Sequence, residues 1–156
     1  MKKIVITGGA GFIGSWVLRK LFLSHKDTEF SIIDNLCSGS SETIKRYTDT
    51  DRVKLYKVDL KNIDEIKHIF ANATDVYHFA ANADIAKATT DPMVDFFEGT
   101  LLTQNVIESA RVNGIKNLIY ASGSGVYGEK KLLSLKEQEA NMEPISPYGA
   151  SKLGCE

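Results

Sequence analysis

Cysteine is scarce in this sequence of 156 residues: only Cys37 and Cys155 occur, far apart and without the spacing of a metal-ligand set. This scarcity argues against a disulfide framework or a zinc site and favours a reduced, cytoplasmic protein. No apolar run approaches the ~18 residues of a membrane span, and the apolar run at the N-terminus is too short for a signal sequence. The sequence therefore predicts neither a membrane protein nor an exported one.

The sequence also lacks an excess of positive charge. Lys plus Arg total 19 and Asp plus Glu total 20, so the formal net charge is −1. A nucleic-acid-binding domain usually carries a basic excess, so this balance argues against a nucleic-acid partner. Apolar residues make up 43% and charged residues 25%, close to the averages for globular proteins. At this length, the chain has the size of one compact domain that can bury a core of its own.

What the sequence does contain is an alternation of short apolar runs with longer helical patterns. The apolar runs lie at residues 4–6, 30–33, 53–56, 76–79 and 118–120. They lack polar alternation, as is typical of strands buried on both faces. Between them, apolar residues recur at helical spacing, for example Ile13, Val17 and Leu21. The alternation predicts an α/β fold, a doubly wound, Rossmann-like parallel sheet of about five strands with helices on both faces.

Two long polar stretches interrupt this pattern. Residues 35–51 predict a loop with one helical turn, and residues 122–144 predict a second long loop. Loops of this length in a compact domain usually serve function. A last helix is predicted to begin with Ser146 as its N-cap and Pro147 at its first position. Because the sequence ends at Glu156, we expect so short a helix to fray and to hold its side chains poorly.

A glycine-rich segment follows the first predicted strand. Gly8, Gly11 and Gly14 are three residues apart, and an amphipathic helix begins within the segment. Glycines at this spacing allow a tight turn, close approach of the backbone to a pyrophosphate and close packing of the helix on the sheet. The helix N-terminus then attracts the anion. The segment predicts a dinucleotide site, although a glycine-rich turn can also be only a turn.

Two carboxylates follow the second and third predicted strands. Asp34 lies 20 residues after Gly14, where a carboxylate can accept hydrogen bonds from the adenosine ribose hydroxyls. It would repel a 2′-phosphate, and no Arg follows at once, so NAD is favoured over NADP. Asp59 and Leu60 are expected to flank the adenine. In each case the alternative is that the carboxylate only caps the structure that follows it.

The last predicted helix carries a tyrosine and a lysine four residues apart. This spacing places Tyr148 and Lys152 on one helix face. A nearby cation favours a phenolate, so we expect Lys152 to lower the pKa of Tyr148. A phenol with a lowered pKa can take a proton from a substrate alcohol while a nicotinamide takes the hydride. On its own, the pair could equally mark a solvated helix face.

Together these segments resemble a known family. The matching segments occur in the family's order: 7–15 (TGGAGFIGS), 34–36 (DNL), 59–60 (DL), 78–81 (HFAA), 126–128 (VYG) and 147–152 (PYGASK). The chain resembles the extended short-chain dehydrogenases/reductases, and among them the NAD-dependent sugar-nucleotide epimerases and dehydratases. Residues 34–37 (DNLC) are most similar to the UDP-glucose 4-epimerases.

The resemblance implies roles for individual residues. Tyr148 would be the acid/base, and Lys152 would hold the ribose of the NAD cofactor and tune Tyr148. We expect His78 to be a packed residue at a strand end rather than a catalyst. The resemblance also implies further residues at the cofactor: Phe12, Ile13, Asn35, Ser38, Gly39, Phe79, Ala80 and Ala81.

Three departures from the family pattern stand out. The family usually has Ser or Thr at position 123, where this chain has Gly123, so Ser124 or Ser122 is expected to supply the catalytic hydroxyl, with Ser124 preferred. Phe96 replaces a common Asn, and we expect a polar contact with the active-site loop to be lost. Family members are roughly twice this length. Residues 1–156 are therefore expected to be the NAD-binding domain of a truncated protein whose C-terminal sugar-nucleotide-binding part is absent.

The resemblance implies 4-epimerisation of a nucleotide sugar, with a UDP-sugar as substrate and a homodimer as a possible assembly. A sugar-nucleotide 4,6-dehydratase or reductase is the nearest enzymatic alternative. Dehydratases carry an Asp-Glu pair where this chain has Ser124 and Gly125, which counts against dehydration. A non-catalytic NAD-binding fragment is the alternative from another class of function.

Overall fold

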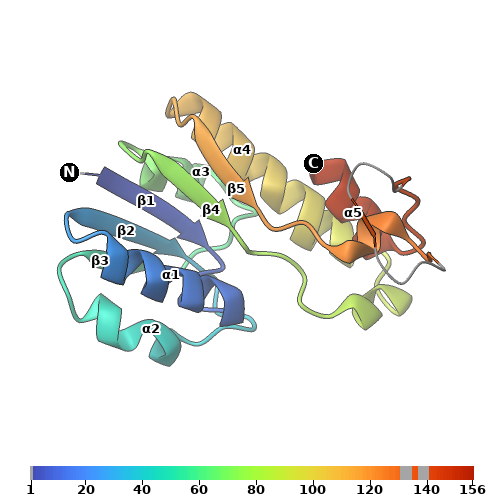
Figure 1. The fold of residues 1–156 in the computed structure, drawn as a ribbon, viewed down its shortest axis with the longest axis horizontal. Helices are drawn as coiled ribbons and strands as arrows, with labels where there is room; N and C mark the ends of the chain where they lie inside the picture. The colour runs from blue at the N-terminus through green and yellow to red at the C-terminus, as the bar shows by residue number, and fades with distance from the viewer. Residues whose placement is uncertain (1, 131–134, 137–140) are drawn as a thin grey trace.

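The protein forms one five-stranded parallel sheet (Figure 1). The structure, a computed structural model, describes residues 2–130, 135–136 and 141–156. The strands lie in the order β3-β2-β1-β4-β5, and all four neighbouring pairs are parallel. Their bounds are β1 Lys2–Thr7, β2 Thr28–Ile33, β3 Val53–Tyr56, β4 Asp75–His78 and β5 Asn117–Tyr120. The predicted doubly wound sheet is confirmed.

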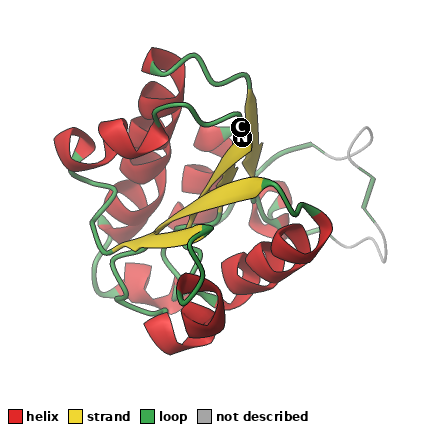
Figure 2. Ribbon diagram, turned by 90° about the vertical axis from the view of Figure 1, so that its left-hand side faces the viewer, coloured by secondary structure: helices red, strands yellow, loops and turns green. Residues whose placement is uncertain are grey.

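Helices cover both faces of this sheet (Figure 2). The α-helices are α1 Phe12–Ser24, α2 Ser41–Thr48, α3 Ile63–Ile66, α4 Leu102–Val112 and α5 Pro147–Cys155. Short 3₁₀ turns are η1 Lys67–Phe70, η2 Ile85–Thr89 and η4 Ser124–Tyr127, and η3 Phe96–Leu101 is a π-helical turn that leads into α4. None of the helices in the described part of the chain is long and apolar enough to cross a membrane.

The strands divide their side chains between two cores, one on each face. Along β1, Ile4 and Ile6 pack with Leu18 of α1 and Ile44 of α2 on one face. Val5, between them, faces the other way and packs in the core that contains α3, η1 and α4. This division follows from the two-residue period of a strand. It explains why β1 is an uninterrupted apolar run, because each of its faces is buried.

The stretch 35–51 contains more helix than its composition suggested. It was expected to hold one helical turn, but α2 runs over eight residues. Ser40 caps it by accepting a hydrogen bond from the Glu42 N–H at 3.3 Å, and Ile44 and Tyr47 are its buried residues. Two apolar residues three positions apart are enough to anchor a short helix, which the polar composition concealed.

The strand order places a switch point at the centre of the sheet. β1 is flanked by β2 on one side and by β4 on the other, so the chain leaves these neighbouring strands toward opposite faces. In open parallel sheets, ligands bind in the crevice at the carboxyl ends of such strands. Gly8 follows β1, Asp34 follows β2 and Phe79 follows β4. The fold therefore brings the predicted site segments to one edge of the sheet.

Candidate functional site

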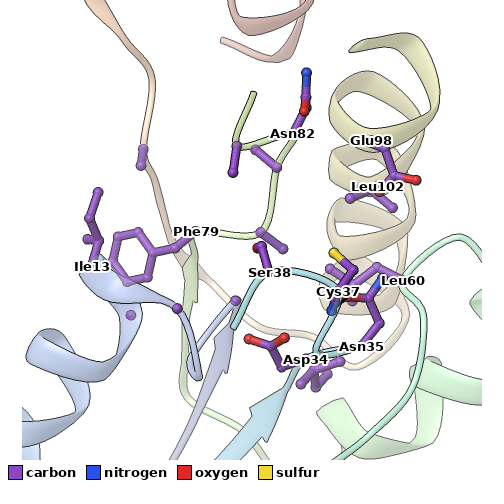
Figure 3. Close-up of a pocket in the computed structure, with 18 of the residues that line it drawn as sticks. Ile13, Asp34, Asn35, Cys37, Ser38, Leu60, Phe79, Asn82, Glu98 and Leu102 are labelled. Atoms are coloured by element: carbon purple, nitrogen blue, oxygen red, sulfur yellow. Dashed lines mark hydrogen bonds between the residues drawn. The ribbon is translucent and has the colours of Figure 1, made fainter. Parts of the chain in front are cut away.

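A cavity of about 380 Å³ opens at this edge of the sheet (Figure 3). Its volume is typical of a small-molecule or cofactor site. Nearly all of the sequence-predicted site residues line it: Gly8, Gly11, Phe12, Ile13, Gly14, Asp34, Asn35, Ser38, Asp59, Leu60, Phe79, Ala80, Ala81, Ser122, Tyr148 and Lys152. Gly39 and Ser124 are the two predicted residues that do not line it. The fold thus joins segments from both ends of the chain in one cavity.

The three glycines of the loop after β1 meet different steric demands. Gly8 has a φ of +66°, and a Cβ there would lie 2.7 Å from the Ala80 backbone nitrogen. A Cβ on Gly14 would overlap the Gly8 carbonyl oxygen, so the absence of a side chain lets α1 pack against the loop. A Cβ on Gly11 would meet only the Gly8 carbonyl oxygen, at 3.3 Å. Gly8 and Gly14 are therefore required by the fold, whereas the fold places a smaller steric demand on Gly11.

The N-terminus of α1 faces the cavity without a capping side chain. Its N-cap is Gly11, which makes no side-chain hydrogen bond, and the first turn contains no acidic residue. The N–H groups of the first helical turn have no partners within the helix, and the helix dipole adds positive potential there. Phe12 and Ile13 in this turn are 82% and 56% exposed, although they are large and apolar. This combination suits an anion with an attached apolar or aromatic group.

Asp34 shapes the cavity as well as lining it. Its Oδ2 accepts a hydrogen bond from the Ala10 N–H at 2.9 Å, and its Oδ1 accepts one from the Leu36 N–H at 2.9 Å. The carboxylate therefore caps the loop after β2, as the alternative interpretation supposed, and ties that loop to the glycine segment. Each carboxylate oxygen can accept more than one hydrogen bond, so Asp34 can still bind ribose hydroxyls. Gly39 lies outside the cavity because it packs on Ala10, where a Cβ would lie 2.9 Å from the backbone.

Asp59 also combines a structural contact with a place at the cavity. Its Oδ1 accepts a hydrogen bond from the Lys61 N–H at 2.9 Å, and its Oδ2 accepts one from Asn35 at 3.3 Å. Burial acts to raise the pKa of Asp59, but these hydrogen bonds and the Lys61 ammonium outweigh burial and lower it. Asp59 is therefore an ionised acceptor that links the loops after β2 and β3.

Helix α5 carries the predicted tyrosine and lysine to the other end of the cavity. Ser146 caps the helix by accepting a hydrogen bond from the Gly149 N–H at 3.0 Å, and Pro147 is its first residue, as predicted. Lys152 is only 5% exposed and donates a hydrogen bond to the Ala121 carbonyl oxygen at 2.8 Å. Its Nζ lies 5.6 Å from the centroid of the Tyr148 ring. The expectation that a short helix would hold these residues poorly is wrong, because the helix is capped and packed against η3 and η4.

The pKa of Tyr148 does not follow the prediction. Lys152 was expected to lower it, but burial of the phenol, followed by the charge of Asp95, raises it. The prediction is wrong because it counted only the charge on the same helix. Burial also lowers the pKa of Lys152, since the ammonium loses its hydration.

His78 lies in a buried chain of hydrogen bonds beneath the cavity. Its Nδ1 lies 2.5 Å from Thr7 Oγ1 and its Nε2 lies 3.0 Å from Thr103 Oγ1, while Thr103 donates its own hydroxyl proton to the Gly99 carbonyl. Thr103 must therefore accept from His78 Nε2–H, which leaves Nδ1 to accept from Thr7. Burial, and then the Lys152 charge, lowers the pKa of His78 to about 3. His78 is a packed neutral residue that joins β1, β4 and α4, in line with the prediction.

Comparisons with known proteins identify the family. Residues 4–156 match the NAD dependent epimerase/dehydratase family. The chain belongs to this family. UDP-arabinose 4-epimerase 1 of Arabidopsis thaliana is 35% identical over 156 residues, which are 96% of this chain and 36% of that protein. The UDP-Glc/GlcNAc 4-epimerase of Campylobacter jejuni has a similar structure, with a TM-score of 0.90 and 34% identity, covering 99% of this chain and 47% of that one.

A third comparison concerns the cofactor. The UDP-glucose 4-epimerase of Thermus thermophilus, solved in complex with NAD, has a TM-score of 0.85 and 32% identity over 98% of this chain and 48% of that one. NAD is the cofactor of the epimerase/dehydratase family to which this chain belongs. The chain spans about half the length of these relatives or less.

Gly123, where the sequence analysis expects a departure from the family pattern, lies beside Tyr148. A Cβ on Gly123 would lie 3.9 Å from the Tyr148 hydroxyl, so a side chain at this position would face the tyrosine. Ser122 lines the cavity and donates a hydrogen bond to the Glu156 carboxylate, whereas Ser124 begins η4 and lies outside the cavity. This arrangement favours Ser122 over the preferred Ser124, and the catalytic role of either serine stays a prediction.

Asp95, the neighbour of Phe96, makes polar contacts that the sequence did not indicate. Phe96 is 48% exposed, whereas Asp95 is 2% exposed and contacts both Asn82 and Ser151. The π-helical turn that begins at Phe96 has i→i+5 hydrogen bonds, which shifts which residues face inward relative to an α-helix. These contacts join Asp95 to the segment after β4 and to α5, and the expected loss of a polar contact between position 96 and the active-site loop stays a prediction.

Sequence reasoning missed several residues that line the cavity. They are Ile33, Cys37, Val58, Asn82, Ala83, Ile85, Glu98, Leu102 and Ala121. Figure 3 shows Glu98 and Leu102 reaching the cavity from η3 and α4, opposite the loop that carries Asn35, Cys37 and Ser38. Asn82 directly follows Ala81, so the sequence could have indicated it, but Glu98 and Leu102 are brought there only by packing. Among the described residues, no group of three His, Cys, Asp or Glu side chains is placed to hold a metal ion.

Proposed function

We propose that this chain is the cofactor-binding part of a UDP-sugar 4-epimerase. The observation that carries the proposal is the convergence of two predicted half-sites in one cavity. Gly11 and Asp34 line it from the N-terminal segments, and Tyr148 and Lys152 line it from α5. The relatives named above are 4-epimerases acting on UDP-sugars, and the chain spans about half of their length or less. Residues beyond that length in the longer relatives would hold the sugar nucleotide.

The cavity residues fit NAD. The uncapped N-terminus of α1 and Gly11 would hold the pyrophosphate, because they offer unpaired N–H groups and close backbone approach. Asp34 would accept hydrogen bonds from the adenosine ribose, and Asp59 and Leu60 would flank the adenine. Lys152 would hold the second ribose next to Tyr148. When bound, NAD supplies the acceptor for a hydride from the sugar.

Tyr148 would handle the proton of the reacting sugar hydroxyl. As a phenolate, Tyr148 would accept that proton when the hydroxyl is oxidised, and the resulting phenol would return a proton when the ketone is reduced on its other face. The Lys152 ammonium favours the phenolate during the first step, and its hydrogen bond to the Ala121 carbonyl fixes its position.

The test uses a version of the protein as long as its relatives. With UDP-glucose or UDP-galactose, the expected result is epimerisation that Tyr148→Phe reduces at least ~100-fold, the usual contribution of a general acid–base. The affinity for NAD should change little. Tyr127→Phe serves as the matched control, because Tyr127 lies in the long loop and does not line the cofactor cavity. Near-normal turnover by Tyr148→Phe would show that Tyr148 is not the acid/base.

One observation favours a second candidate, a non-catalytic NAD-binding module. Gly123 faces the Tyr148 hydroxyl but has no hydroxyl of its own. A module of this kind would bind NAD without reducing it in the presence of UDP-sugars. The absorbance of reduced nicotinamide separates the candidates. A 4,6-dehydratase is disfavoured because Ser124 and Gly125 offer no carboxylate.

Two further features belong to this proposal. The free thiols of Cys37 and Cys155 support a reducing, cytoplasmic setting. The exposed aromatic pair Phe96 and Phe97, in edge-to-face contact with ring centroids 5.3 Å apart, supports a homodimer. Sedimentation of the longer protein would show whether a dimer forms.

A further inference from the structure

A buried carboxylate lies behind the helix that carries Tyr148. Asp95 is 2% exposed and immediately precedes the π-helical turn η3. Its Oδ1 accepts a hydrogen bond from the Asn82 side chain at 2.8 Å, and Asn82 lines the cavity. Its backbone carbonyl accepts a hydrogen bond from the Ser151 hydroxyl of α5, also at 2.8 Å. Asp95 therefore connects the cavity wall to helix α5.

The second oxygen of this carboxylate is unusual. Within the described part of the chain, Asp95 Oδ2 is buried and has no hydrogen-bond partner. A buried polar atom without a partner costs stability, so its presence calls for an explanation. Asn82, by contrast, satisfies its amide with Asp95 and with the Asp84 backbone, and Thr100 donates to Ser151 at 3.3 Å. Within this cluster of described residues, Asp95 Oδ2 is the buried side-chain atom without a partner.

Tyr148 and Ser151 are three residues apart on α5 and so lie on neighbouring parts of the same helix face. The Ser151 hydroxyl contacts Asp95, and a Cβ on Gly99 would overlap that hydroxyl, so α5 packs closely on the π-helical turn. Two charged groups are placed to act on the phenol: Lys152 on its own helix, with Nζ 5.6 Å from the ring centroid, and Asp95. Lys152 is the cation of this set and Asp95 is its carboxylate.

From this arrangement we infer that Asp95 is a positioning residue for Tyr148: its carbonyl anchors α5, and its carboxylate provides a fixed negative charge that opposes Lys152 at the phenol. The inference rests on the proposed role of Tyr148 as acid/base. The raised pKa of Tyr148, caused by burial and then by Asp95, supports it. The opposing charges would keep the phenol protonated until a positive charge arrives nearby, such as an oxidised nicotinamide ring.

The decisive measurement is a direct titration of the Tyr148 phenol in the purified chain. Tyrosine labelled with ¹³C at Cζ gives one signal for each of the six tyrosines, and loss of a signal in Tyr148→Phe assigns it. In the unmutated chain, Tyr148 should titrate above free tyrosine. Asp95→Asn keeps the backbone anchor and removes the charge, and it should raise the acid dissociation constant of Tyr148 roughly three- to tenfold. Asp64→Asn removes an exposed carboxylate on α3 and should leave Tyr148 unchanged.

A second variant separates the anchor from the charge. Ser151→Ala removes the hydroxyl that donates to the Asp95 carbonyl, and the α5 amides should then exchange hydrogen at least several-fold faster. Unchanged α5 exchange in Ser151→Ala would overturn the anchoring role. An unchanged or higher Tyr148 midpoint in folded Asp95→Asn would overturn the charge role. If Asp95→Asn does not fold, the unmutated chain provides the test: a titration midpoint of Tyr148 below that of free tyrosine would also overturn the charge role.

These outcomes are independent of turnover. If Tyr148→Phe retains epimerisation in the longer protein, the proposed function fails, while the titration still reports whether Asp95 acts on the phenol. Conversely, an inactive Tyr148→Phe with an unshifted Asp95→Asn titration would refute only the role of Asp95.

Discussion

Three single substitutions, Gly8→Ala, Gly11→Ala and Gly14→Ala, separate the demands of the fold from the demands of the cofactor. Gly8 has a left-handed φ of +66°, which costs an Ala residue ~1–2 kcal/mol. Overlap of the new methyl with the Ala80 backbone adds a cost of ~1–3 kcal/mol for overpacking. Gly8→Ala should therefore lower the free energy of unfolding by about 3 kcal/mol.

Gly14→Ala and Gly11→Ala should lower the free energy of unfolding by amounts that differ from that of Gly8→Ala and from each other. At Gly14, a Cβ would overlap the Gly8 carbonyl and lie 2.7 Å from Gly9 Cα, so the backbone must move. The overpacking cost of ~1–3 kcal/mol is reduced by ~1 kcal/mol, because Ala favours a helix interior over Gly. Gly11 has an ordinary φ of −79° and is the N-cap of α1, so Gly11→Ala should cost only about 1 kcal/mol.

The losses of NAD affinity should run in the opposite order to the losses of stability. A methyl at Gly11 would stand where the cavity meets the free N–H groups of α1, so Gly11→Ala should weaken NAD at least ~10-fold, or about 1.4 kcal/mol. Urea unfolding followed by circular dichroism gives the stability, and fluorescence titration gives the affinity. If Gly11→Ala bound NAD as tightly as the unmutated chain does, the proposal that Gly11 and the N-terminus of α1 hold the pyrophosphate would be refuted. A loss of stability in Gly11→Ala larger than in Gly14→Ala would refute the steric ranking.

Two further predictions concern Asp34 and His78. NAD should bind at least ~10-fold more tightly than NADP in titrations that follow the fluorescence of Trp16. Asp34→Ala should narrow this difference in affinity, because a carboxylate repels a 2′-phosphate. Tighter binding of NADP than of NAD to the unmutated chain would contradict this role of Asp34. The pKa of His78 is lowered from 6.5 to about 3 in the folded chain. Between these two pH values the unfolded chain therefore binds one proton more than the folded chain at this residue. The free energy of unfolding should fall as the pH falls, by up to about 1.4 kcal/mol per pH unit from His78. Urea unfolding of His78→Gln should show a shallower pH dependence than the exposed control His68→Gln, and equal slopes would show that His78 is not the source.

Local patterns made much of this structure predictable. The strand runs and the Ser146 cap depend on neighbours in sequence, and each is found where it was expected. Burial on both faces holds for β1, whereas the edge strands β3 and β5 are only partly buried. The pKa of Tyr148 was predicted with the wrong sign, because the burial and the Asp95 charge that determine it come from other parts of the chain. Glu98 and Leu102 reach the cavity through packing of α4, which no spacing in the sequence indicates.

The π-helical turn η3 is an example of a feature that the sequence pattern did not predict. Phe96, the first residue of this turn, is half-exposed, whereas Asp95, immediately before it, is buried. The partners of Asp95 are Asn82 and Ser151, which are 13 and 56 residues away in the sequence. Sequence patterns describe which residues repeat, and they do not show which distant group will accept or donate a hydrogen bond.

The central position of β1 affects how the chain can assemble on a ribosome. Three neighbouring strands, β3-β2-β1, come from the first 56 residues, but β4, which pairs with the other edge of β1, begins at Asp75. At ~5–20 residues per second, that edge of β1 would wait for seconds before its partner is synthesised. An unpaired apolar edge is a site for wrong pairing between nascent chains, so this is the interval in which a chaperone would have most to protect. The adenosine side of the cavity, with Gly11 and Asp34, can form well before Tyr148 leaves the ribosome.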